Sequence, residues 1–245
     1  MIHGLFDIEA AYRPTEAESA APVPPVQAVL FDFSNTLFSM IDLPTWLRRV
    51  AAASGRSDLL DAEGAFKAAV HQLNAGYRDP EVARLQTGRD LSSERHWEAM
   101  HAWWSRVDLL QGAEEAAYEV LRAPDSWVPY PDTAPVLRAL KEAGIRLGIV
   151  SDFGWDLRFH LKRHDLAELV DTCVISCELG REKPDPELFR IACDRLGVDP
   201  RAALMVGDNP VRDGAAVACG LRAYLLPAEP RTGERGLSHV LDFLH

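Results

Sequence analysis

The sequence lacks several features that would indicate a membrane or secreted protein. It contains no run of about 20 apolar residues, the length that a membrane-spanning helix needs. Its beginning shows no basic stretch followed by an apolar one, so residues 1–25, rich in Pro, Ala and Glu, are interpreted as a flexible leader and not as a secretory signal. The cysteines are too few and too scattered for a disulfide framework: Cys173, Cys177, Cys193 and Cys219. We therefore expect a cytoplasmic protein with reduced thiols and no membrane partner.

An excess of positive charge is also missing. The chain has 26 lysines and arginines against 37 aspartates and glutamates, a formal net charge of −11. This argues against binding of nucleic acid or an anionic membrane through bulk electrostatics, although a local positive pocket can still hold a phosphate group. A small molecule is the expected partner, and the protein is expected to be a monomer or a homodimer.

The length and the changes of pattern along the chain predict one domain with an insertion. A chain of 245 residues is long for one core and short for two. Residues 26–31 form a short apolar run typical of a buried parallel strand. Residues 41–128 then show helical periodicity and are predicted to form an inserted helical cap domain, with helices over 44–53, 58–73, 92–107 and 112–122. The core domain is expected to comprise residues 26–40 and 129–245.

The part of the chain after residue 129 alternates between helical and strand patterns. Strands are predicted over 145–150, 169–175, 203–206 and 221–225, and helices over 132–143, 154–164, 185–196 and 210–219. Such alternation predicts an α/β fold with a Rossmann-like parallel sheet that helices cover on both faces.

Polar residues follow four of the predicted strands. Asp32 comes after the first, Ser151 and Asp152 after the second, Lys183 in the loop after the third, and Asp208 and Asn209 after the fourth. Ligands of parallel α/β sheets bind beyond the carboxyl ends of the strands. Each string by itself is explained as well by a turn or a helix start, but four in succession indicate a site.

The order Asp, Ser, Lys, Asp resembles the four motifs of the haloacid dehalogenase superfamily, over residues 26 to about 225, with the helical segment where that family has its cap. The resemblance implies a hydrolase in which Asp32 attacks phosphorus and becomes an aspartyl phosphate. It implies Mg²⁺ as cofactor, bound by Asp32, the backbone carbonyl of Ser34 and Asp208, with Asp213 as the second acid of that loop. Lys183 and Ser151 would hold the phosphoryl oxygens, with Asp152 and Asn209 beside them.

Two residues depart from the family pattern. Ser34 stands where the family usually has the Asp that acts as general acid and base, and loss of such help typically costs about 10²–10⁴-fold in rate. Alkyl phosphate monoesters are therefore expected to be poor substrates, and acyl phosphates better ones. Asp152 stands where Asn is more usual, and a carboxylate there repels phosphate unless it is turned away, metal-linked or protonated.

Three alternatives to a phosphatase remain open at this point. A catalytically impaired protein of this family would bind a ligand or partner without turnover. A 2-haloacid dehalogenase would need no Mg²⁺, so the acidic residues Asp208 and Asp213 favour phosphorus chemistry. A phosphonatase-like enzyme would need a lysine in the helical segment, where Lys67 is the one candidate and is better explained as a solvated surface residue.

The helical segment offers weaker candidates. Its tryptophans, and the series His96, Met100, Trp103, Trp104 and Val107 at helical spacing, are interpreted mainly as core. Arg48, Arg49 and Arg56 follow the first motif closely and are the expected contacts for a substrate anion.

Overall fold

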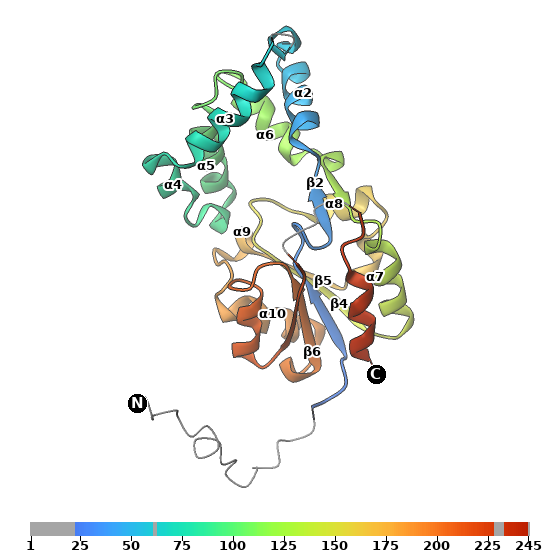
Figure 1. The fold of residues 1–245 in the computed structure, drawn as a ribbon. Coiled ribbons are helices and arrows are strands. Elements are labelled where there is room, and N and C mark those ends of the chain that lie inside the picture. Colours follow the sequence, from blue (N-terminus) through green and yellow to red (C-terminus); the bar gives the residue numbers. More distant parts are fainter. Residues whose placement is uncertain (1–22, 61–62, 228–232, 245) are drawn as a thin grey trace, which may run out of the picture.

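The computed structural model describes residues 23–60, 63–227 and 233–244. Its α/β core lies beneath a helical insertion, and a narrow ribbon joins the two (Figure 1). The leader expected over residues 1–25 falls almost entirely outside the described residues. No helix in the described part of the chain has the length and apolarity required to cross a bilayer.

The core sheet has five parallel strands, as the sequence predicts. They are β1 (Ala28–Phe31), β4 (Arg146–Ser151), β5 (Thr172–Ile175), β6 (Ala203–Gly207) and β7 (Arg222–Leu225), in the order β5-β4-β1-β6-β7. Strand β1 is central and fully buried, which explains its unbroken apolar sequence. The α/β fold class is thereby confirmed.

Helices cover both faces of the sheet and enclose two apolar cores. One face packs against α7 (Thr133–Glu142), α8 (Arg158–Arg163) and the 3₁₀ segment η7 (Leu237–Leu244), and the other against α10 (Pro186–Leu196) and the 3₁₀ segment η6 (Gly214–Cys219). Short segments complete the core: η4 (Ala167–Leu169), α9 (Ser176–Leu179) and η5 (Pro200–Ala202).

Two predicted core helices are shorter than expected. The helix predicted over 210–219 begins only at Gly214, because the Asn209 side-chain oxygen accepts hydrogen bonds from the N–H groups of Val211 and Arg212 and holds a turn there. The helix predicted over 154–164 begins at Arg158, where the Asp156 side-chain oxygen accepts a hydrogen bond from the Arg158 N–H and holds a turn before the helix.

The insertion lies between the two strands of the ribbon, β2 (Phe38–Met40) and β3 (Trp127–Pro129). It comprises α2 (Leu43–Ala53), η1 (Ser57–Leu60), α3 (Ala65–Tyr77), α4 (Pro80–Gln86), η2 (Arg89–Leu91), α5 (Ser93–Trp104), α6 (Glu114–Arg122) and η3 (Pro124–Ser126). The single helix predicted over 58–73 is divided into η1 and α3, and both α4 and the ribbon were missed. Helix α4 begins where Asp79 accepts hydrogen bonds from the next turn, directly before Pro80.

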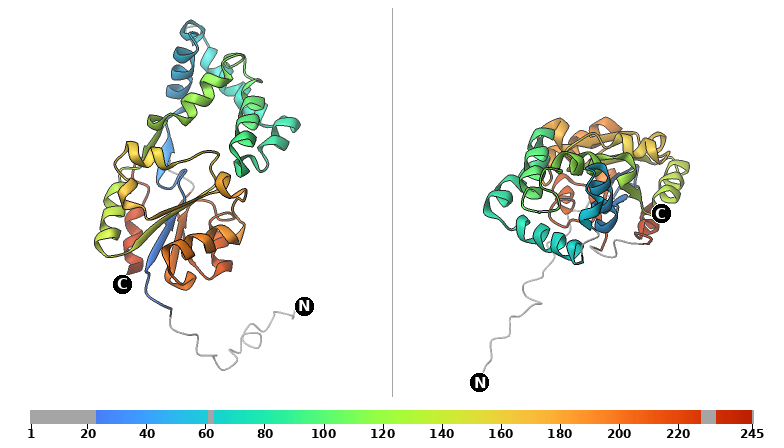
Figure 2. Two further views of the ribbon diagram at one scale, coloured as in Figure 1. Left: turned by 180° about the vertical axis from the view of Figure 1, so that it is seen from behind. Right: turned by 90° about the horizontal axis from the view of Figure 1, so that it is seen from above.

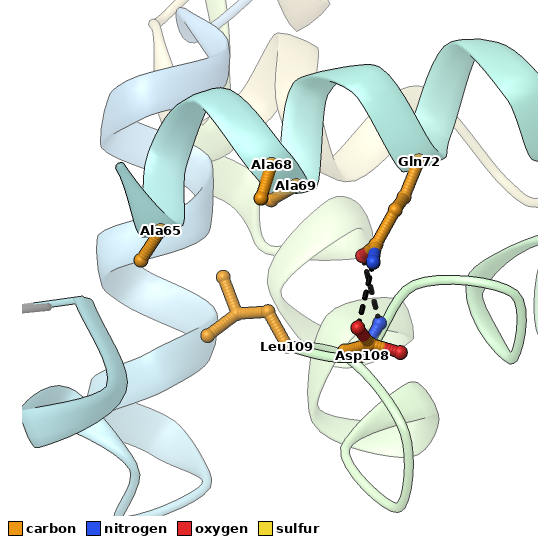
Figure 3. Close-up of a pocket in the computed structure, with 6 residues that line it drawn as sticks. All are labelled: Ala65, Ala68, Ala69, Gln72, Asp108 and Leu109. Carbon is orange, nitrogen blue, oxygen red and sulfur yellow. Dashed lines mark hydrogen bonds between the residues drawn. The ribbon is translucent and has the colours of Figure 1, made fainter. Parts of the chain in front are cut away.

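The tryptophans of the insertion contribute to its buried interior, as the sequence predicts, and this interior is continuous with the apolar core on one face of the sheet. Trp46 and Trp104 are buried with ring centroids 5.4 Å apart. Figure 3 shows a small alanine-lined hollow inside the insertion, where Gln72 and Asp108 hydrogen-bond to each other. Viewed from behind and from above, the insertion lies beyond the carboxyl ends of the core strands (Figure 2). That is the edge of the sheet where ligands are expected.

Candidate active site

Asp32 lies at the carboxyl end of the central strand, at the edge of the sheet. It follows β1 directly, and its backbone N–H donates to the Val206 carbonyl oxygen of the neighbouring strand at 2.9 Å. The chain then turns sharply through Asn35, whose φ of 57° lies in the left-handed region that Asn tolerates. The N–H of Phe38 closes this turn on the carbonyl oxygen of Phe33 at 2.9 Å. The strand end and the turn thus fix the Asp32 carboxylate at the edge of the sheet.

Lys183 joins Asp32 to a second buried carboxylate. Its Nζ lies 2.8 Å from Asp32 Oδ1 and 2.6 Å from Asp213 Oδ1, and only 3% of the lysine side chain is exposed. Asp208 completes the group, since one carboxylate oxygen each from Asp32, Asp208 and Asp213 lie within 4.8 Å of one another. Residues that are far apart in sequence therefore form one compact charged cluster.

The loop after β6 is shaped around Asp213. Asp213 Oδ2 accepts a hydrogen bond from the Asn209 N–H at 2.9 Å, while Oδ1 accepts from Lys183. A Cβ at Gly207 would lie 2.2 Å from Asp213 Oδ2, so a side chain at position 207 would displace this carboxylate.

Burial dominates the electrostatics of the cluster. It raises the pKa of Asp32 to about 6, with Lys183 opposing the rise and Asp213 adding to it. Burial also raises the pKa of Asp208, as does Asp213. For Lys183, burial disfavours the charged form, but Asp32 and Asp213 outweigh it and raise the lysine's pKa. The lysine is therefore a fixed positive charge between carboxylates.

The donor atoms suit a hard divalent cation. Three carboxylates supply oxygen ligands, and neither sulfur nor imidazole takes part in the cluster. Mg²⁺ prefers such oxygen donors and is commonly bound by one or two carboxylates together with substrate phosphate and water. The residues present therefore fit Mg²⁺.

A pocket of about 240 Å³ opens above the cluster. Its lining contains five carboxylates and three basic groups, an excess of negative charge that favours a cation: Asp32, Ser34, Asn35, Arg89, Asp90, Asp152, Lys183, Asp208, Asn209, Arg212 and Asp213. Arg89 and Asp90 come from the helical insertion. They were missed in the sequence, where the only available signal is a charged pair in a short connection between helices.

The predicted phosphate contacts differ in their surroundings. Ser151 ends β4 and is fully buried, and its Oγ has no hydrogen-bond partner among the residues that the structure describes, although Ser151 is not among the residues that line the pocket. A buried hydroxyl without a partner is costly unless a ligand supplies one. Asn209 lines the pocket, but its side-chain oxygen already accepts from the loop.

Both carboxylate oxygens of Asp152 already have partners within the protein. Its Oδ1 accepts the Lys183 backbone N–H at 2.8 Å, and its Oδ2 lies 2.6 Å from Arg212 Nη1. The sequence reasoning considered a carboxylate that is turned away, metal-linked or protonated, whereas the structure gives an ion pair with a basic residue. Arg212 was missed, although it lies in the same loop as Asp208 and Asp213.

The arginines expected to contact a substrate anion do not lie in the pocket. Arg49 forms an ion pair with Asp125, and the Arg56 guanidinium donates to the Gln111 carbonyl oxygen. Arg48 and Lys67 are likewise not among its lining residues. The expectation was wrong because α2 leads away from the site, whereas η2 returns to it (Figure 1).

Arg235 reaches the first-motif turn from the C-terminal part of the chain. Its Nε donates to the Asn35 carbonyl oxygen at 2.6 Å, and the neighbouring N–H groups of residues 235–237 donate to the Asp132 carboxylate. The guanidinium is buried and its positive charge acts to lower the pKa of Asp208. No local sequence pattern indicates this role.

Several known proteins are similar to this chain. Residues 26–220 match the family model for haloacid dehalogenase-like hydrolases. The chain is 42% identical over 196 residues to glyceraldehyde 3-phosphate phosphatase of Methanopyrus kandleri, covering 77% of this chain and 78% of that enzyme. It is 38% identical over 95 residues, 38% of each chain, to (S)-2-haloacid dehalogenase 4A of Burkholderia cepacia. A phosphatase structure from Thermococcus onnurineus superposes with a TM-score of 0.59 at 25% identity, over 89% of this chain and 98% of that one.

Proposed function

Because the chain belongs to the haloacid dehalogenase-like hydrolase family, we propose that it is a Mg²⁺-dependent phosphatase of a small phosphorylated molecule. The observation that supports this most strongly is the contact of Lys183 with both Asp32 and Asp213, beside Asp208. This arrangement offers a nucleophilic oxygen, a fixed cation for phosphoryl oxygens and an oxygen-rich site for a divalent ion. The pocket of about 240 Å³ suits a small substrate.

In this proposal the Asp32 carboxylate attacks phosphorus and forms an aspartyl phosphate, which water then hydrolyses. Lys183 neutralises charge on the phosphoryl oxygens, and the Ser151 hydroxyl, which has no partner in the described part of the chain, supplies a hydrogen bond to them. Asp32, Asp208, Asp213 and the Ser34 carbonyl would hold Mg²⁺, which offsets the repulsion between phosphate and carboxylates.

Ser34 narrows the substrates that this site handles well. Its hydroxyl does not supply a proton to a departing alkoxide. Acyl phosphates, whose leaving group needs no proton, are therefore expected to react faster than simple alkyl monoesters.

The proposal is tested by phosphate release from acetyl phosphate and p-nitrophenyl phosphate, with Mg²⁺ and with a chelator. We expect release that requires Mg²⁺ and is abolished in Asp32→Asn. Asp108→Asn, in the insertion and remote from the pocket, is the matched control. Absence of release from both substrates, with Asp32→Asn equal to wild type, would contradict the proposal.

A dehalogenase is the second candidate, because a dehalogenase is among the relatives and Ser34 is compatible with carbon–halogen chemistry. Such an enzyme would release halide from a 2-chloroacid in the presence of a chelator. The two further carboxylates beside Asp32, those of Asp208 and Asp213, favour the phosphatase, since metal-independent displacement of halide needs the nucleophile but no acidic metal ligands. Tight binding of Mg²⁺ and phosphate without turnover would instead favour a ligand-binding protein.

A further inference from the structure

Asp90 lies in the wall of the pocket opposite its floor of core residues. It belongs to η2 of the helical insertion, yet it lines the same pocket as Asp32 and Lys183. Its side chain is largely buried, with 13% exposed. Its carboxylate lines the pocket that contains the reacting centre but is not part of the cluster of Asp32, Asp208 and Asp213.

Direct contacts between insertion and core keep Asp90 in this place. The Ser176 hydroxyl of the core donates to the Asp90 carbonyl oxygen at 2.6 Å and accepts the Phe153 N–H at 2.9 Å. The His96 ring packs against Gly154 so closely that a Cβ there would lie 2.4 Å from His96 Cγ. Asp90 is thus fixed relative to the core.

The geometry of phosphoryl transfer gives the wall a role. In an in-line displacement the leaving oxygen lies on the side of phosphorus opposite the attacking oxygen. Asp32 attacks from the strand end, so the leaving oxygen points away from the sheet and toward the insertion, which lies beyond the strand ends (Figure 1). A proton donor for that oxygen is therefore best placed on the insertion.

The burial of Asp90 suits a proton donor. The nearest groups are Arg89, with Nε 3.6 Å from Oδ2, and His96, with Nε2 3.8 Å from Oδ1. Burial raises the pKa of Asp90. The positive charges of Arg89 and Arg212 oppose this rise, and the negative charge of Asp152 adds to it. Glu182, Tyr118 and Cys177 also lie within electrostatic reach. The raised pKa allows Asp90 to hold a proton at a higher pH than an ordinary aspartate.

We propose that Asp90 is the general acid and base of this site, supplying from the insertion the proton transfer that Ser34 does not provide. This inference rests on the proposed phosphatase function. It means that activity toward esters with poor leaving groups depends on the insertion staying in contact with the core.

The proton is transferred in two steps, and atoms and charges balance in each. In the first, an Asp32 oxygen bonds to phosphorus, the bond from phosphorus to the leaving oxygen breaks, and that oxygen takes the proton of neutral Asp90 to leave as an alcohol. In the second, ionised Asp90 takes a proton from water as the water oxygen bonds to phosphorus. The bond to Asp32 then breaks, and phosphate, ionised Asp32 and neutral Asp90 are restored.

Substrates that differ in their need for a proton test this role. In Asp90→Asn we expect kcat/KM for phenyl phosphate to fall by about 100-fold or more, and kcat/KM for acetyl phosphate to stay within about threefold of wild type. The ratio kcat/KM is the appropriate measure because it reports only the steps up to and including departure of the first leaving group. Asp108→Asn should leave both values unchanged.

Two outcomes would overturn the role of Asp90. Equal losses on both substrates would assign Asp90 a structural role, and an unchanged kcat/KM for phenyl phosphate would exclude it as the acid. The double variant with Ser34→Asp provides a second check, since a carboxylate at position 34 should restore phenyl phosphate hydrolysis in Asp90→Asn. Failure of the proposed function would look different, because wild type would then release phosphate from neither substrate.

Discussion

The Asp152 carboxylate forms an ion pair with Arg212, whose Nη1 lies 2.6 Å from Asp152 Oδ2. The two residues are brought together by neighbouring loops at the edge of the sheet, after β4 and after β6. This pair explains how a carboxylate is tolerated beside the proposed phosphate site. Its charge is balanced by Arg212, and its other oxygen is occupied by the Lys183 N–H.

Removal of Arg212 should therefore weaken substrate binding through Asp152. In Arg212→Gln we expect KM for acetyl phosphate to rise roughly 10- to 100-fold, because an unbalanced charge a few ångströms from phosphate costs about 1–3 kcal/mol. Asp152→Asn in the same background should restore most of the affinity. Arg190→Gln, which affects only an exposed ion pair, serves as the control. No recovery in the double variant would show that Arg212 acts by another route.

Restoring the missing carboxylate at position 34 should widen the substrate range. Ser34→Asp places an acid on the nucleophile's own turn, and in the Asp90→Asn background, where no other acid serves the leaving oxygen, we expect hydrolysis of simple alkyl monoesters to rise by about 10²-fold or more. Acetyl phosphate turnover should change little. Steady-state kinetics on both substrates measure this, and an unchanged alkyl ester rate would show that the deficit lies elsewhere in the site.

Lys183 should contribute to stability as well as to chemistry. Lys183→Gln leaves Asp32 and Asp213 buried without their cation, and we expect the free energy of unfolding at neutral pH to fall by about 3–5 kcal/mol. Mg²⁺ should recover part of this loss, because it supplies positive charge to the same carboxylates. Urea denaturation measures both effects. Lys162→Gln, an exposed lysine on α8, should change the value by less than about 0.5 kcal/mol.

The pH dependence of activity should show the ionisation of Asp32. The nucleophile must be ionised, and its pKa is raised to about 6, so kcat/KM for acetyl phosphate should fall as the pH drops through that value. A bound cation favours the ionised form and should move the fall to lower pH. Profiles at low and saturating Mg²⁺ check this, and a profile that is flat through pH 6 at low Mg²⁺ would contradict it.

Gly154→Ala should separate the insertion from the core. The new Cβ would clash with His96, and we expect a loss of about 1–3 kcal/mol in the free energy of unfolding. Phenyl phosphate hydrolysis should fall more than acetyl phosphate hydrolysis, because Asp90 is displaced. Gly214→Ala is the control, since its Cβ would meet only Leu225 Cδ1 at 3.9 Å. Equal loss on both substrates would argue against a link between the contact and Asp90.

The sequence was sufficient to predict the floor of the candidate site. Asp32, Lys183 and Asp208 follow apolar strands, and parallel strands bring their carboxyl ends to one edge, so strand order alone gathers these residues. The five core strands were also predictable, because buried parallel strands appear in the sequence as unbroken apolar runs.

The wall of the site was not predictable in the same way. Arg89 and Asp90 approach the core only because α4 and α5 fold back after η2, and no local pattern encodes that return. Proximity to the first motif favoured Arg48 and Arg49 instead, but α2 leads away from the pocket. The position of Arg235 was likewise not predictable, because it contacts Asn35, which is 200 residues away in the sequence.

The most direct test of the central claim, that Asp32 is a nucleophile toward phosphorus, is the mass of the intact protein after an acid quench during turnover of acetyl phosphate. We predict a fraction of chains heavier by one phosphoryl group, with the group on Asp32, dependent on Mg²⁺ and lost after hydroxylamine treatment. Asp32→Asn should show no such species. Equal labelling in Asp32→Asn, or steady phosphate release by that variant at the wild-type rate, would contradict the account.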